Sequence, residues 1–76
     1  MPTLTHSEVL KHEEFGDGTF SLNLKRMEYF SYGNNYGWVE YIVEMYFPKF
    51  KLASIFRFED RDKANQLFIL MVDGKK

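Results

Sequence analysis

Cysteine is absent from the chain. Neither a disulfide framework nor a thiolate metal site can therefore form, and the composition is more typical of the cytosol than of an oxidising compartment. Long apolar runs are also missing, because the longest, Leu67 to Val72, is far too short to cross a bilayer. Met1 to Leu10 lacks the basic stretch and the continuous apolar stretch of a secretion signal. We expect a cytoplasmic protein that does not associate with membranes.

A strong charge of either sign is missing too. The formal net charge is -1 and the pI is about 6.1, so no broad field would attract the protein to nucleic acid or to an anionic membrane. No repeat, low-complexity tract or linker divides the 76 residues, which predicts a single small domain over residues 1–76. Aromatic residues make up 18% of the chain, and they predict a small core rich in large rings.

Signatures of catalysis are lacking as well. The serines sit in no nucleophile-elbow context. The segment Gly33 to Gly37 lacks the Lys-Ser/Thr ending of a phosphate loop and is more typical of a hairpin turn. On a regular helix His6 and His12 would be displaced by about two-thirds of a turn and would not converge on one metal ion. We predict a protein that is not an enzyme, with no catalytic residue, no cofactor and no metal site.

The most informative pattern is a pair of stretches, Val39 to Phe47 and Phe50 to Phe58, that can fold back on each other about Pro48-Lys49. Four apolar pairs would then share one face, namely Phe47/Phe50, Met45/Leu52, Tyr41/Phe56 and Val39/Phe58. The opposite face would pair Tyr46 with Lys51, Ile42 with Ile55 and Glu40 with Arg57. Such aromatic, aliphatic and opposite-charge pairs are typical of antiparallel strands, so the sequence predicts a specific hairpin.

The rest of the chain extends this hairpin into an α+β fold. Alternating Phe20, Leu22 and Leu24 predict a strand that begins near Thr19, after the turn cluster 15–19, with a bulge near Lys25-Arg26. A tight turn centred on Asn34-Asn35 would place Phe30 opposite Val39. Before the first strand, Thr5 or Ser7 could cap a short helix that runs to about His12.

The C-terminal segment predicts a helix. Asp60 can cap it, and apolar residues recur at helical spacing at Ala64, Leu67, Phe68 and Met71. We predict helix over Asp60 to Phe68, while Phe68 to Val72 is open between helix and a fourth strand. The fold class is therefore a three-stranded antiparallel meander, Thr19 to Tyr32, Trp38 to Phe47 and Phe50 to Phe58, packed against a C-terminal helix.

The sheet face away from this helix carries the candidate site. Aromatic and aliphatic residues are mixed there with charges, and the proposed binding residues are Tyr29, Trp38, Ile42, Tyr46 and Arg57. Glu40 and Glu44 on the same face are expected to form cross-strand ion pairs. Three interpretations are open: the N-terminal segment folds over this face as a second small core, the face binds a protein or a second copy, or it stacks single-stranded bases.

One segment has a resemblance. Phe56-Arg-Phe-Glu-Asp-Arg-Asp-Lys-Ala-Asn-Gln-Leu-Phe68 resembles a segment of short uncharacterised proteins of large tailed bacteriophages, over about a sixth of the chain. The resemblance implies a small virus-encoded protein, a class that often binds and inhibits a host protein in the host cytoplasm.

The leading functional hypothesis is thus a non-enzymatic module that binds a protein, as an inhibitor or adaptor, through the aromatic sheet face or an exposed edge strand. The alternative is a single-stranded nucleic-acid-binding protein that uses the same aromatics with Lys25, Lys51 and Arg57.

Overall fold

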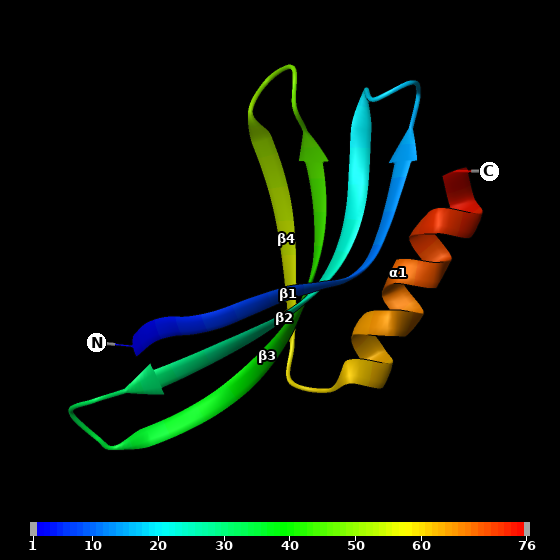
Figure 1. Cartoon of the computed structure of the whole chain (residues 1–76). Coiled ribbons are helices and arrows are strands. Elements are labelled where there is room, and N and C mark those ends of the chain that lie inside the picture. Colours follow the sequence, from blue (N-terminus) through cyan, green and yellow to red (C-terminus); the bar gives the residue numbers. More distant parts are fainter. Residues whose placement is uncertain (1, 76) are drawn as a thin grey trace.

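The computed structural model describes residues 2–75. Four strands are followed by one helix: β1 (Pro2–Phe15), β2 (Phe20–Ser31), β3 (Tyr36–Phe47), β4 (Leu52–Phe58) and α1 (Arg61–Lys75). The strands form one antiparallel sheet in the order β1-β2-β3-β4. The predicted α+β class, an antiparallel meander packed against a C-terminal helix, is confirmed, and it includes a fourth strand (Figure 1).

The molecule is elongated because α1 covers only part of the sheet. Its extents are 43 × 27 × 15 Å and its radius of gyration is 13.8 Å, whereas a compact chain of this length would have about 11 Å. Beyond the helix and β4, the sheet continues as a bent extension that holds the N-terminus and the β2–β3 turn (Figure 1). We call this extension, residues 2–8, 26–31 and 36–40 with the turn between β2 and β3, the arm.

The core lies between α1 and one face of the sheet. Leu22, Leu24 and Val43 are almost fully buried there, as expected for alternate residues of neighbouring strands. The helix contributes three buried residues at helical spacing, Ala64, Phe68 and Val72, with Leu67 and Met71 packed beside them. The predicted helical stripe of Ala64, Leu67, Phe68 and Met71 is therefore confirmed.

The helix begins as the sequence predicts but runs further. The Asp60 carboxylate accepts a hydrogen bond from the Asp62 backbone N–H at 2.9 Å, which is the expected cap. The helix continues through Phe68 to Val72, so a strand in that segment is wrong. Val72 is buried against the sheet while Ile69 and Leu70 remain exposed, and this one-sided burial supports helix throughout.

The fourth strand comes from the N-terminus, where the predicted short helix is wrong. Residues 2–15 pair with β2 along its whole length. Two register shifts, between Leu4 and His6 and between Val9 and Lys11, place the bulges in β1, while β2 pairs with β3 without interruption, so the bulge predicted within β2 is also wrong. A weak helical sequence thus forms a strand because the β2 edge satisfies its backbone groups.

Both predicted hairpin registers are wrong by two residues. Phe47 pairs with Leu52 and Tyr41 with Phe58, and Ser31 pairs with Tyr36. Each turn has four residues instead of two, with Lys51 and Asn35 in left-handed conformations at φ of 53° and 50°. Because a shift of two preserves the alternation of side chains, the predicted division of residues between the two faces still holds.

We predict that Leu22→Ala lowers the free energy of unfolding by about 3 kcal/mol, since it leaves a cavity in the centre of the core. Leu22 is 0% exposed, whereas Leu70 is 69% exposed, so Leu70→Ala should change it by no more than about 0.5 kcal/mol. Urea unfolding of the three proteins measures both values. Equal losses in the two variants would show that α1 does not pack on the sheet in this way.

Candidate functional site

The face of the sheet opposite α1 is uncovered in the part of the chain that the structure describes. The N-terminal segment joins the sheet edge as β1, so its predicted alternative role as a cover over this face is wrong. Cross-strand register places all five proposed binding residues, Tyr29, Trp38, Ile42, Tyr46 and Arg57, on this face. They do not form one cluster.

Tyr29 and Trp38 form the centre of an aromatic stack on the arm. They are direct cross-strand partners, with ring centroids 5.6 Å apart and planes inclined by 18°. Tyr36 stacks on the other side of Trp38 at 5.8 Å. Tyr36 is not among the residues predicted for this site, because it lies in the predicted turn segment Gly33 to Gly37. Its spacing of two residues from Trp38 is nevertheless the signal of a shared strand face.

The other three proposed residues lie elsewhere. Ile42 is only 6% exposed and is flanked by Lys25 on β2 and Arg57 on β4. Tyr46 is eight residues along β3 from Trp38, up to about 26 Å for an extended strand. A single ligand of modest size therefore cannot contact Trp38 and Tyr46 together.

Beside the stack, the outer edge of β3 is unpaired. Within residues 2–75, β4 pairs with β3 only from Tyr41 onward, so residues 36–40 have a strand on one side only. A hollow of about 390 Å³ lies there, lined by Tyr36, Trp38, Val39, Glu40 and Glu59. We call it the edge hollow; it combines two aromatic rings with two carboxylates.

Glu40 is the most unusual group in the edge hollow. Its Oε2 accepts a hydrogen bond from the Trp38 indole N–H at 3.1 Å. Its Oε1 is buried and has no hydrogen-bond partner within the described residues. An unpaired buried carboxylate oxygen is costly, and a bound cation or N–H donor would remove that cost. Arg57 pairs in register with Ile42 and lines a neighbouring hollow of about 240 Å³ with Glu40 and Glu59, but the predicted ion pair between Glu40 and Arg57 is not formed.

The opposite face of the arm carries a second, shallower hollow of about 500 Å³, with Phe30, Tyr32 and Val39 among its lining residues. Phe30 lies over Gly37 on the neighbouring strand, where an added Cβ would approach the Phe30 ring to 3.3 Å. A side chain at Gly37 would therefore crowd the Phe30 ring.

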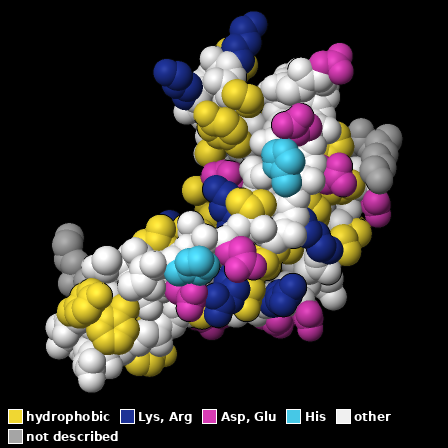
Figure 2. Space-filling view, in the orientation of Figure 1, with side chains coloured by type: hydrophobic (Ala, Val, Ile, Leu, Met, Phe, Trp, Pro, Cys, Tyr) yellow, Lys and Arg dark blue, Asp and Glu magenta, His cyan; other side chains and the backbone are white. Residues whose placement is uncertain are grey.

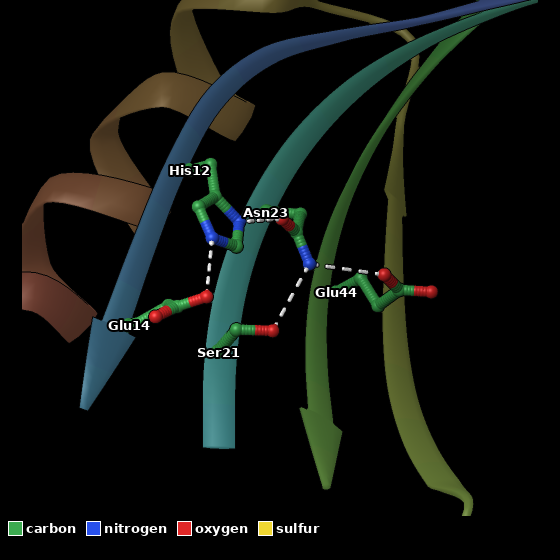
Figure 3. A network of polar contacts seen from close by, with 5 residues as sticks. All are labelled: His12, Glu14, Ser21, Asn23 and Glu44. Carbon is green, nitrogen blue, oxygen red and sulfur yellow. Dashed lines mark hydrogen bonds and ion pairs between the residues drawn. The ribbon is translucent and has the colours of Figure 1, made fainter. Parts of the chain in front are cut away.

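A ladder of polar side chains crosses the middle of the uncovered face (Figure 3). The Asn23 amide nitrogen donates to Glu44 Oε1 at 3.2 Å, and Lys25 Nζ lies 3.2 Å from the same oxygen. Glu44 therefore forms a cross-strand ion pair, as expected, and its partner is Lys25. On the other side, Asn23 Oδ1 accepts from His12 Nδ1, and His12 Nε2 faces Glu14 at 3.3 Å.

Both ring nitrogens of His12 thus face acceptors, and only the protonated imidazolium can donate to both. The hydrogen bond to Asn23, and then the hydrogen bond to Glu14, raise the pKa of His12 above its ordinary value of 6.5. This ladder is a structural network between three strands.

Two of the three cations named for nucleic-acid binding are not grouped with the aromatic stack, whereas the third, Arg57, lines a neighbouring hollow together with Glu40 and Glu59. Lys25 is engaged by Glu44 and is 27% exposed, and Lys51 lies in the β3–β4 turn. Figure 2 shows hydrophobic side chains on the arm, while dark-blue cationic side chains stand at the tip of the β3–β4 hairpin, at the other end of the molecule.

Among residues 2–75 there is no group of three His, Asp or Glu side chains that could hold a metal ion. His6 and His12 lie on a strand, not on the predicted helix, and they face opposite sides of the sheet, since His6 pairs with Glu28 and His12 with Asn23. Over the same residues, α1 falls short of the length and apolarity of a membrane-spanning helix.

Comparisons of the chain with protein-family models, with curated proteins and with solved structures found no match.

We predict that stability falls as pH rises through the pKa of His12. The folded-state pKa lies above the value of about 6.5 in the unfolded chain, so this contribution is fully present below that value and is lost as pH rises through the folded-state pKa. Urea unfolding at about pH 5.5 and about pH 8.5 should show a larger loss for the wild type than for His12→Gln. The control His6→Gln keeps the contacts of His12 and should behave as the wild type; an identical loss in His12→Gln would contradict the assignment.

Proposed function

We propose that the protein is a non-enzymatic protein-binding module that captures an extended, cationic segment of a partner protein at the unpaired edge of β3. The observation that carries the proposal is the edge hollow, where Tyr36 and Trp38 stand beside Glu40, whose buried Oε1 has no partner within the described residues. Binding there would act by occupying the partner's surface, as an inhibitor or adaptor does.

The backbone supports binding by strand addition. Residues 36–40 of β3 are paired only with β2 within the described chain, so backbone donors and acceptors on the outer side are available to an incoming strand. The position is the one that β4 would occupy if it continued past Phe58. A partner strand of about five residues would extend the sheet along the arm.

The side chains of the edge hollow specify the charge of that strand. An Arg or Lys side chain beside Glu40 would satisfy the unpaired oxygen with a charge-assisted hydrogen bond. Tyr36 is 61% exposed, and its ring attracts a cation as well. Glu59 adds a second carboxylate to the same lining.

The same chemistry favours protein over nucleic acid. Glu40 and Glu59 would repel phosphate next to the rings on which bases would have to stack. Lys25 is paired with Glu44, and Lys51 belongs to the turn at the far end of β3. The resemblance of residues 56–68 to proteins of tailed bacteriophages supports a host protein as the target and the host cytoplasm as the place of action.

The first experiment is capture of partners from a lysate of the source cells, or of host cells if the protein is viral, with and without nuclease. Wild-type protein is compared with Tyr36→Ala and with Tyr32→Ala, a matched control in the same hairpin. These tyrosines are 61% and 71% exposed, so both variants should fold. We expect a stoichiometric protein that survives nuclease and is lost only with Tyr36→Ala. Loss of all bound material on nuclease treatment would favour nucleic acid instead.

We predict that a short peptide of alternating Arg and Val changes the fluorescence of Trp38, whereas one of alternating Glu and Val does not. Trp38 is the only tryptophan of the chain, so the signal comes from the arm, where Trp38 lines the edge hollow. Glu40→Gln should weaken binding by about tenfold or more, because it removes a charged acceptor. Glu8→Gln, with the same change in net charge on β1, should have no effect.

Binding of the acidic peptide with equal affinity would overturn the proposal. The proposal would also be overturned if Glu40→Gln responded more strongly to single-stranded DNA than the wild type responds to the basic peptide. Removing a carboxylate favours the binding of phosphate.

A further inference from the structure

The two outer strands of the sheet differ in how well they are protected against pairing. The β1 edge is polar and carries two register shifts, Pro2 at its start, and several charged residues. Bulges, proline and charges are the usual devices that prevent an edge strand from pairing with another chain. We therefore regard β1 as a protected edge.

The β4 edge has fewer of these devices. Its seven residues, Leu-Ala-Ser-Ile-Phe-Arg-Phe, pair with β3 in an uninterrupted register and include one charge and no proline. Large apolar side chains are exposed on and next to it, at 45% to 64%, namely Phe50, Leu52, Ile55 and Phe56. Exposed apolar residues on both faces of an unpaired edge are typical of a strand that pairs with another strand.

The helix leaves room beside this edge. Asn65 of α1 accepts a hydrogen bond from Lys11 of β1 at 2.6 Å, and Ile69 borders a hollow with the same lysine, so this flank of α1 faces β1. By helical geometry, Leu67 and Met71 belong to the other flank, toward β4, and both are only half-buried. Leu70 lies on the side of α1 away from the sheet and is 69% exposed.

From these observations we infer that β4 pairs antiparallel with β4 of a second copy, about a two-fold axis at Ile55. The two four-stranded sheets then join into one continuous sheet with both helices on the same side. The pairing uses β4, beside residues 41–47 of β3, and it shares only Glu59 with the edge hollow. It therefore goes beyond the proposed function and does not depend on it.

Charge complementarity selects the second copy and this register. When Ile55 faces Ile55 of the second copy, Leu52 faces Phe58 and Ser54 faces Phe56. Lys51 and Glu59 flank the strand, so they face each other at both ends of the pair. A register shifted by two residues one way places Lys51 opposite Arg57. The shift the other way places Leu52 opposite Asp60. Only the central register pairs opposite charges and avoids both mismatches.

The first test is the mass of the protein in solution, by sedimentation equilibrium over a range of concentrations. We expect a dimer of twice the chain mass of 9.1 kDa. Ile55→Lys places two like charges at the axis and should raise the dimer dissociation constant by about tenfold or more. Leu4→Lys is the matched control, because Leu4 on β1 and Ile55 are both 47% exposed. A monomeric wild type, or equal weakening by both variants, would overturn the proposal.

The second test examines the register. Lys51→Glu and Glu59→Lys should each weaken the dimer, and the double variant should restore it, because opposite charges again face each other. Since the chain has no cysteine, Ile55→Cys supplies a single thiol, and mild oxidation should link two copies across the axis, whereas Leu4→Cys should not link them. Failure of the double variant to restore dimerisation, or linkage in Leu4→Cys alone, would overturn this register.

Discussion

The difference in length between the sheet and the helix determines the rest of the structure. The twelve residues of β2 extend about 40 Å, while the fifteen residues of α1 span about 22 Å. One helix can therefore cover only about half of the sheet. The chain must also leave β4 at Phe58 to begin α1 at Arg61, and that exit leaves the outer edge of β3 unpaired and brings Glu59 beside Glu40. The arm, its unpaired edge and the edge hollow all follow from this one geometric constraint.

The covered and uncovered halves of the sheet are stabilised in different ways. Under α1, burial of Leu22, Leu24 and Val43 supplies the hydrophobic free energy. On the arm, cross-strand contacts must serve instead: the stacked rings of Tyr29, Tyr36 and Trp38, and Phe30 over Gly37. Such pairs contribute only about 0.2–1 kcal/mol each. The arm is therefore the part of the fold whose local stability would gain most from a bound partner.

The sequence predicts which side chains share a face far better than it predicts which residues pair. Alternation assigned Leu22, Leu24 and Met45 to the helix side and Tyr29 and Trp38 to the other side, because burial depends on parity alone. The predicted pairs were wrong by two residues. A two-residue turn and a four-residue turn place the same apolar residues on each face, and the turns that form have four residues and end in Asn35 and Lys51.

The N-terminal strand and the edge hollow could not be predicted for a related reason. Residues 2–15 have no apolar alternation of their own, and they form a strand because the edge of β2 is available. The edge hollow depends on where β4 stops relative to β3, which follows from the turn length. The sequence therefore predicts that Tyr29, Trp38 and Glu40 share a face, but not that Tyr36 joins them or that a hollow lies there.

The two proposed surfaces also have a geometric relation. The edge hollow lies at the start of β3, and the β4 edge runs beside its end. A two-fold axis through Ile55 turns one copy by half a revolution in the plane of the sheet, so the two arms would point in opposite directions from the shared β4 pair. Each arm would keep its unpaired β3 edge, since the partner strand lies outside β4 and not in line with it. A dimer of this kind would present two binding edges on one rigid sheet, which favours a partner that is itself oligomeric or repeats its cationic segment, because the second contact forms at high effective concentration.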